Sequence, residues 1–444
     1  MTSGVDTTLV GGAGNDSYTA TNLTLTAGDV LSGGDGTDAL NLTSTLAGTY
    51  GTGVVMTGVE NVNVTASVGT ATVDASGFTG VTGVTSSGST ADVVFNGLKT
   101  IPTVNMTATS SNLTVGFATA VTTGTTDAAT INVNGAAGTG AATLTINGVE
   151  TLNVATSGSN TGSSAGALTI TGDALSTLNI TGTATARVSA ALVATASAAG
   201  TVTSDAGAHD VTFTVPAGAA ANVAMGAGND TVRISSISAA QTIAGGDGTD
   251  TLVAGATAIT TTTGANISGF ETVSIGAASV ALPTATNTVA TVAFTDAAGG
   301  GTYTGLAAGS TVNQTVSGAN TVVNTAWATP TTDALTINVG SASAGGAITQ
   351  GLTATGIDTA TINNLQLSTD ATARSVGITS ANLASLTVNS TGAAPITITG
   401  GGVALATINA AGVNGTVTNN ATTATAGFSL TTGAGADALT GGAG

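Results

Sequence analysis

Glycines and acidic residues recur together in turns whose oxygen atoms suit a hard metal ion. Gly-Ala-Gly-Asn-Asp occupies residues 12–16 and again 226–230, and Gly-Gly-Asp-Gly-Thr-Asp occupies residues 33–38 and 245–250. Glycine permits tight turns that expose backbone carbonyls, and the aspartate adds a carboxylate. Ca²⁺ binds about six to eight such oxygens. The pattern therefore predicts calcium binding, with ordinary metal-free Gly-Asp turns as the alternative.

The last aspartate of each motif is the best candidate ligand. We expect the metal sites to use Asp16, Asp38, Asp230 and Asp250, then Asp6, Asp29, Asp35, Asp247 and Asp437, together with Gly12, Gly14, Gly34, Gly36, Gly226, Gly228, Gly246 and Gly248. The apolar residue two places after each final aspartate should point into the core. These residues are Tyr18, Leu40, Val232, Leu252 and Leu439.

The spacing of the motifs matches a calcium β-roll, in which one coil holds two nonapeptides, about 18 residues. Asp29 and Asp38 are 9 residues apart, which is half a coil. Asp16 and Asp38 are 22 apart, and Asp230 and Asp250 are 20 apart, so each pair is separated by about one coil. We therefore expect at least one calcium ion to be held between adjacent coils in each copy of the motif pair.

The motifs belong to a long internal repeat. Besides the two glycine-rich motifs, Gly-Val-Glu at 58–60 is matched by Gly-Phe-Glu at 269–271, and Gly-Val-Glu at 148–150 by Gly-Ile-Asp at 356–358. All four pairs keep their order and similar spacing, which is hard to obtain by chance. We divide the chain into residues 1–224, residues 225–432, and residues 433–444 as the start of a truncated third copy. The ending inside a motif suggests a fragment of a longer protein.

Short apolar-polar alternations, cut by Gly, Asn and Asp, predict an all-β fold. Residues 142–146 and 178–180 alternate with period two, and no βαβ pattern appears. One Ala-rich helix is expected at residues 188–199. Aromatics are only 2% of the chain, so the core should consist of small apolar residues. These features favour a parallel β-solenoid with calcium β-roll repeats; an array of β-sandwich domains is the alternative.

Charge excludes several partners. The chain of 444 residues carries 22 acidic side chains against 4 Lys and Arg, a net charge of −18. Nucleic acids and anionic membranes need cationic contacts, so we expect neither as a partner. Carboxylates without counter-charge repel one another, and divalent cations would relieve that repulsion. Residues 1–9 lack a signal peptide pattern, and no stretch is long enough to span a bilayer. An export signal would therefore lie elsewhere.

Three further patterns have a structural and a functional interpretation. The acid of the Gly-apolar-acid motif (Glu60, Glu150, Glu271 and Asp358) either binds calcium or caps a turn before a buried strand, and we favour the cap. Asn63 and Asn153 are expected to form side-chain ladders. The many Thr-x-Thr steps raise the possibility of an ice-binding face, but their irregular spacing along the chain favours ordinary outward-facing strand threonines.

Nothing in the sequence predicts catalysis. The chain has no Cys and a single His, His209, beside Asp210 but without a nucleophile elbow. We expect His209 in a surface turn. Zinc would need more His or Cys ligands. Paired acids for glycoside hydrolysis remain conceivable, but the aspartates gather in the predicted calcium turns. We therefore expect a protein that is not an enzyme.

Residues 25–38 followed by 58–64, and residues 225–232 followed by 245–250 and 269–273, resemble the RTX surface-layer proteins of Caulobacter and related alphaproteobacteria. The Thr, Ala, Gly and Val background is similar along most of the chain. The resemblance implies a protein exported by type I secretion that assembles into a two-dimensional lattice with Ca²⁺, the acids of the calcium motifs being the ligands. No secretion segment or lipopolysaccharide-anchoring domain is recognisable here.

Together these observations predict a calcium-dependent structural protein of the cell surface that self-assembles into a surface-layer (S-layer) lattice. The expected partner is a second copy of the chain, with glycan or lipopolysaccharide contacted through regions outside it. The alternative is a calcium-rigidified stalk segment of a giant RTX adhesin. A larger number of repeat units in the whole protein would favour the stalk.

Overall fold

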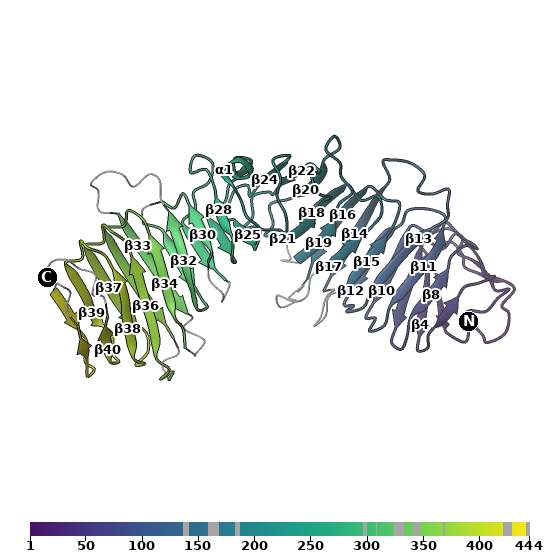
Figure 1. Ribbon diagram of the computed structural model, residues 1–444. Coiled ribbons are helices and arrows are strands. Elements are labelled where there is room, and N and C mark those ends of the chain that lie inside the picture. The colour runs from purple at the N-terminus through teal and green to yellow at the C-terminus, as the bar shows by residue number, and fades with distance from the viewer. Residues whose placement is uncertain are drawn as a thin grey trace. The chain divides into compact units, whose positions relative to one another are not determined.

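The fold of the chain is a parallel β-solenoid, seen in a computed structural model (Figure 1). The structure describes residues 1–135, 142–158, 168–182, 187–295, 300–307, 309–323, 333–340, 347–366, 369–420 and 429–440. Strands of successive coils pair in parallel throughout these residues, and helix is almost absent. The predicted fold class is confirmed over the alternative of β-sandwich domains.

The chain forms two compact units. Unit 1 comprises residues 1–231 and 240–242, and unit 2 comprises residues 232–239 and 243–444. The chain passes from one unit to the other within strands β23 (Thr231–Ile234) and β24 (Gln241–Ala244).

Unit 1 has three sheets, which we call 1A, 1B and 1C. Sheet 1A contains β1 (Leu9–Val10), β3 (Val30–Ser32), β6 (Val55–Thr57) and β9 (Phe78–Thr79). Sheet 1B contains β2 (Ser17–Thr21), β4 (Ala39–Ser44), β7 (Asn61–Ala66), β10 (Gly83–Ser87), β12 (Thr103–Thr107), β14 (Ala128–Asn134), β16 (Thr151–Ser157), β18 (Thr177–Gly182), β20 (Gly200–Ser204) and β22 (Ala221–Ala224). Sheet 1C contains β5 (Gly48–Tyr50), β8 (Ala71–Asp74), β11 (Val93–Leu98), β13 (Leu113–Phe117), β15 (Thr143–Ile146), β17 (Leu168–Thr171), β19 (Arg187–Ala191) and β21 (Asp210–Thr214).

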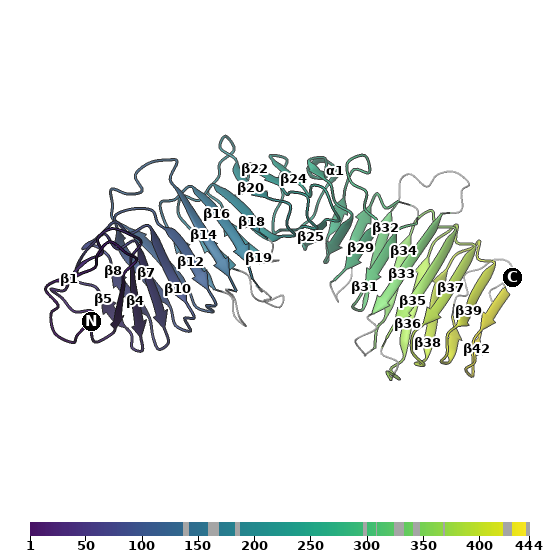
Figure 2. The same ribbon diagram turned by 180° about the vertical axis from the view of Figure 1, so that it is seen from behind.

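Unit 2 has two long sheets, 2C and 2D, whose strands run side by side in Figure 2. Sheet 2C contains β25 (Thr251–Gly255), β27 (Thr272–Ile275), β29 (Thr291–Phe294), β31 (Thr311–Gln314), β33 (Ala334–Gly340), β35 (Thr359–Leu365), β37 (Ser385–Ser390), β39 (Thr407–Gly412) and β41 (Ser429–Thr432). Sheet 2D contains β28 (Ser279–Ala281), β30 (Thr302–Thr304), β32 (Gly318–Val323), β34 (Gln350–Ala354), β36 (Arg374–Thr379), β38 (Ile396–Gly401), β40 (Val417–Asn419) and β42 (Ala438–Leu439). The short strand β26 (Ile267–Ser268) pairs with the end of β24.

Alternating sequence produces a thin apolar core between the sheets. Successive strand residues point to opposite faces, so every second residue is buried. Leu40, Val62, Val84 and Val104 stack in register across sheet 1B, and each is at most 1% exposed. As the composition predicts, the core consists mainly of Val, Ala, Leu and Ile, with a few rings such as Phe95.

The predicted helix at residues 188–199 is wrong. Residues 187–191 form β19, which pairs with β17 and β21 and buries Val188 and Ala190. Backbone hydrogen bonds to two neighbouring coils outweigh the helix propensity of alanine there. The helix that the structure describes is a single turn, α1 (Thr261–Gly264), capped by reciprocal bonds between Thr260 and Thr263. No helix among the described residues is long and apolar enough to cross a membrane.

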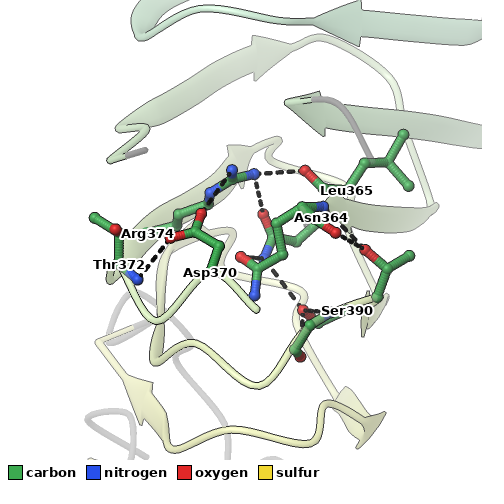
Figure 3. A network of polar contacts seen from close by, with 9 residues as sticks. Asn364, Leu365, Asp370, Thr372, Arg374 and Ser390 are labelled. Carbon is green, nitrogen blue, oxygen red and sulfur yellow. Dashed lines mark hydrogen bonds and ion pairs between the residues drawn. The ribbon is translucent and has the colours of Figure 1, made fainter. Parts of the chain in front are cut away.

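A buried cation in unit 2 organises a polar network inside the solenoid (Figure 3). Arg374 is 2% exposed and donates through Nη1 to Leu365 O at 2.6 Å and to Asn364 Oδ1 at 3.2 Å. Its Nη2 lies 3.4 Å from Asp370 Oδ2. Burial lowers the pKa of Arg374 from its usual value, and the charge of Asp370 opposes this effect. The network therefore joins β35 and β36 through paired rather than isolated polar groups.

Candidate metal centre

Acidic residues stack at one corner of unit 1, each immediately before a strand of sheet 1B. The backbone N–H of Asp16 donates to Asp38 Oδ1 at 2.7 Å, and that of Asp38 donates to Glu60 Oε2 at 2.7 Å. Each carboxylate therefore accepts a hydrogen bond from the corner residue one coil earlier. We call this arrangement the corner ladder.

The corner ladder explains the Gly-apolar-acid motif. The N–H of Asp127 donates to Glu150 Oε2 at 2.8 Å. In unit 2, Asp250 donates in the same way to Glu271 Oε2 at 2.8 Å, and Asp333 donates to Asp358 Oδ2 at 3.1 Å. With Glu60, all four acids of the motif accept a hydrogen bond from a backbone N–H one coil earlier, which is the bonding expected of a structural cap.

A buried oxygen pair at Gly33 is the best cation site that the geometry offers. Asp38 is fully buried, and its Oδ2 is buried with no hydrogen-bond partner. Gly58 O and Asp38 Oδ2 both approach Gly33 so closely that a β-carbon there would collide with them. Two acceptor oxygens thus lie close to the same glycine, and one of them, Asp38 Oδ2, has no hydrogen-bond partner, which costs free energy unless a cation is present.

The close approach of a carbonyl and a carboxylate to one glycine recurs in unit 2. A β-carbon on Gly245 would collide with Gly269 O and would lie 2.8 Å from Asp250 Oδ2. Asp250 is fully buried, as Asp38 is. One coil before Gly33, Gly33 O and Asp16 Oδ2 approach Gly11 in a similar way, but there Asp16 Oδ2 accepts from Gly12 N at 2.6 Å. One local geometry therefore recurs: a carboxylate oxygen and a carbonyl oxygen of the next coil both lie close to the same glycine.

The carboxylates of two other predicted ligands, Asp29 and Asp6, accept hydrogen bonds from nearby residues. Asp29 is fully buried, and its carboxylate accepts from Asp6 N at 2.7 Å, Thr26 N at 2.7 Å and Thr26 Oγ1 at 3.1 Å. The carboxylate of Asp6 accepts from Thr2 N and Thr2 Oγ1, each at 2.8 Å. These bonds, led by that from Thr2 N, lower the pKa of Asp6. Asp29 and Asp38 lie at different corners of one coil, before β3 and β4.

The remaining predicted acids have varied surroundings. Asp35 and Asp247 are exposed. Asp230 is 1% exposed and accepts from His209 N at 2.7 Å. Burial raises the pKa of Asp230, and the hydrogen bond from His209 N partly offsets this by lowering it. Asp437 accepts from Val417 N at 2.9 Å, and hydrogen bonds from Thr432 and Val417 lower its pKa. The structure thus brings Asp16 and Asp38 into one ladder but leaves Asp35 and Asp247 at the surface.

The predicted glycines form the turns beside the corner ladder. Gly34, Gly36, Gly246 and Gly248 have φ of 101°, 128°, 106° and 138°, a region that favours glycine. Gly12 O accepts from Asp35 N at 2.9 Å, and Gly14 O packs against Gly36 of the next coil. In the second copy, Gly226 packs against Asp205 O and Gly228 against Gly207 O.

The apolar positions after the aspartates are mostly as predicted. Leu40, Val232 and Leu252 are fully buried, and Tyr18 is 9% exposed. The prediction that Leu439 points into the core is wrong, because Leu439 is 55% exposed. In the described part of the chain β42 pairs only with β40, so no further coil covers it. The last residues of the predicted third motif, 441–444, lie outside the described residues.

Sequence reasoning missed the backbone carbonyl oxygens and two members of the corner ladder, Asp127 and Asp333. Gly33, Gly58, Gly245 and Gly269 provide or permit the close oxygen contacts, yet they were not among the predicted ligands. The signal was present, because Gly58 and Gly269 open the Gly-apolar-acid motif one coil after each Gly-Gly pair. Asp127 and Asp333 occupy equivalent places in the two copies but lack a flanking glycine motif.

His209 is buried and lies beside Asp205 rather than beside its sequence neighbour Asp210. It is 2% exposed, so the prediction of a surface turn is wrong. Its Nε2 lies 2.8 Å from Asp205 Oδ1, whereas the neighbouring Asp210 pairs with Arg187 at 3.4 Å. His209 directly precedes β21, and in extended backbone adjacent side chains point to opposite sides, so His209 and Asp210 have different partners.

No group of three or more His, Cys, Asp or Glu gathers at one point within the described ranges. A calcium ion at the corner ladder would therefore be held by one carboxylate or two together with backbone carbonyls. Few carboxylates give weak calcium sites, of the kind found in extracellular modules with Kd of about 10⁻⁴–10⁻³ M.

Comparisons with protein-family models and with curated proteins found no relative of the chain. No family model matches the chain, and no curated protein shows a significant match to it.

Proposed function

We propose that this chain is a calcium-stabilised structural protein of the cell surface that assembles into an S-layer lattice. The observation that carries the calcium part is the buried, unpartnered Asp38 Oδ2 beside Gly58 O, repeated in geometry at Asp250 and Gly269. The net charge of −18 supports it, because bound cations would reduce carboxylate repulsion.

The lattice part rests on the sequence resemblance to Caulobacter-type surface-layer proteins and on the solenoid form. A solenoid offers long, repetitive side faces suited to contacts between copies. The parallel β-solenoid suits a scaffold, as it equally suits the stalk of an RTX adhesin. Export by type I secretion and an extracellular location follow from the same resemblance and belong to the proposal.

Calcium dependence is tested by urea unfolding in millimolar Ca²⁺ and after chelation. A ligand that binds only the folded state stabilises it by RT ln(1 + [ligand]/Kd), so 1 mM Ca²⁺ at a site with a Kd of about 10⁻⁴–10⁻³ M contributes about 0.4–1.4 kcal/mol. We expect the wild type to lose stability of this order on chelation. An unfolding curve that chelation does not change would contradict the calcium proposal.

The variant Asp38→Asn identifies the site. The amide oxygen can still accept from Asp16 N, while the amide nitrogen can donate to Gly58 O. We expect this variant to be more stable than the wild type without calcium and to gain less from calcium. Asp92→Asn is the matched control: it removes the same charge from a carboxylate that accepts from Asn112 N at 3.0 Å, away from the corner ladder.

Lattice formation is tested by electron microscopy of the same samples. Ordered sheets that disappear on chelation are the expected result. Rods in Ca²⁺ that never form sheets at any concentration would favour the adhesin stalk and contradict the lattice.

A further inference from the structure

The outward face of sheet 2C has an unbroken column of threonines. Parallel register pairs each member with the next, from β25 to β37. The seven residues are Thr251, Thr272, Thr291, Thr311, Thr336, Thr361 and Thr387. The chain distance between neighbours varies from 19 residues (Thr272 to Thr291) to 26 (Thr361 to Thr387), yet in space they stack one per strand. The irregular spacing in the sequence thus hides a regular array.

A second column runs beside the first. Asn313, Asn338, Asn363 and Asn389 lie two residues after four of the threonines and are also in register. Each of the last three donates through Nδ2 to the Oδ1 of the Asn one strand earlier, at 2.9, 3.1 and 3.1 Å. These bonds fix the amide orientations, and branching at Cβ restricts the threonine rotamers. We call the two columns the Thr–Asn face.

The repeat shows that the fold does not require threonine at these positions. The corresponding column of sheet 1B, which also starts beside the corner ladder, has mixed composition. From β4 to β18 it reads Ala39, Asn61, Gly83, Thr103, Thr130, Asn153 and Asn179. Both copies form the same type of strand, so strand propensity alone does not account for seven threonines in unit 2.

The Thr–Asn face carries no charge in a chain of net charge −18. No Asp, Glu, Lys or Arg occurs in any of the nine strands of sheet 2C, and their aromatic side chain, Phe294, points inward. The face therefore lacks the cations that an anionic ligand needs and the exposed rings on which a sugar stacks. It offers only hydroxyl, methyl and amide groups.

We propose that the Thr–Asn face binds ice. Stacked strands lie about 4.7–4.9 Å apart, and residues two apart in a strand lie about 6.6 Å apart, a two-dimensional grid close to that of water oxygens in hexagonal ice. Rigid hydroxyls and amides on this grid anchor surface water in ice-like positions, while the methyl groups lie between them. The proposal is independent of calcium binding at the corner ladder.

The test measures ice binding by the purified protein in Ca²⁺. Thermal hysteresis by nanolitre osmometry and incorporation into a growing ice hemisphere are the readouts, and we expect both for the wild type. Thr336→Lys places a flexible charge in the middle of the column and should abolish both. Thr130→Lys makes the same change at the corresponding position of unit 1 and should leave both unchanged.

A third variant separates ice binding from folding. Thr336→Val preserves shape and strand propensity but removes one hydroxyl, and we expect reduced thermal hysteresis with an unchanged unfolding midpoint. Three outcomes would overturn the proposal: no hysteresis or incorporation by the wild type, equal loss in Thr336→Lys and Thr130→Lys, or no loss in either. Sedimentation that shows pairing of copies, abolished by Thr336→Lys, would assign the face to self-association instead.

Discussion

The backbone N–H of Asp38 donates to Glu60 Oε2 at 2.7 Å. The carboxylate of one coil thus accepts a hydrogen bond from the backbone at the corner of the preceding coil. The Asp250–Glu271 pair repeats this bond in unit 2 at 2.8 Å. The corner ladder thus ties the coils together outside the sheets themselves.

Removing the carboxylate of Glu60 should destabilise the fold, because a backbone donor loses its acceptor. Glu60→Ala leaves the N–H of Asp38 without its acceptor, and we expect a loss of about 1–3 kcal/mol in the free energy of unfolding. Glu60→Gln retains an acceptor oxygen and should lose less than half of that. Urea unfolding after chelation measures both. Equal losses in the two variants would show that charge, not the hydrogen bond, matters.

Gly33 should not tolerate a side chain. In Gly33→Ala the new β-carbon would collide with Gly58 O and Asp38 Oδ2, so a coil must shift. We expect destabilisation of about 3 kcal/mol or more, at the upper end of overpacking effects. Gly12→Ala is the control, because a β-carbon there meets nothing within 4 Å. Thermal unfolding of both variants measures the effect. Similar midpoints would contradict the close approach of Gly58 O and Asp38 Oδ2 to Gly33.

Arg374 should stabilise unit 2 far more than Arg187 stabilises unit 1. Arg374→Ala leaves Asp370 and Asn364 without their buried partner, and removing one member of a buried pair costs about 3–5 kcal/mol. Arg187 and Asp210 are 25% and 18% exposed, so Arg187→Ala should cost about 1 kcal/mol or less. Denaturant unfolding of both variants compares them. A larger loss for Arg187→Ala would refute the assignment.

Acid should weaken unit 1 through Asp205. Burial raises the pKa of Asp205, but hydrogen bonds from His209 Nε2, Gly182 N and Gly207 N outweigh it and lower the pKa to about 2. Because the folded-state pKa lies below the unfolded value of 3.8, this stabilisation is complete above pH 4 and is lost between pH 4 and 2. Unfolding of wild type and Asp205→Asn across that window, without calcium, measures it. The variant should show a flatter dependence; parallel curves would exclude Asp205.

Several features of the fold were predictable because they depend on local chemistry. Period-two alternation around Leu144 and Leu178 indicated strands, and both residues are fully buried. The Asn ladders are confirmed, since Asn63 donates to Asn41 and Asn179 to Asn153. The helix at residues 188–199 failed because alanine is compatible with both states, and bonding between coils decided which one formed.

The sequence by itself determined the all-β solenoid, the inward apolar positions and the two copies of the acidic corners. These follow from side-chain alternation and from turns that only glycine permits. Only the tertiary structure decided which carboxylate oxygens are hydrogen-bonded: both oxygens of Asp29 accept from backbone N–H groups, whereas Asp38 Oδ2 has no hydrogen-bond partner and lies close to the same glycine as Gly58 O. It also decided that irregularly spaced threonines form one column. The physical reason is that hydrogen bonds and core packing between coils fix strand register, while loops absorb differences in coil length.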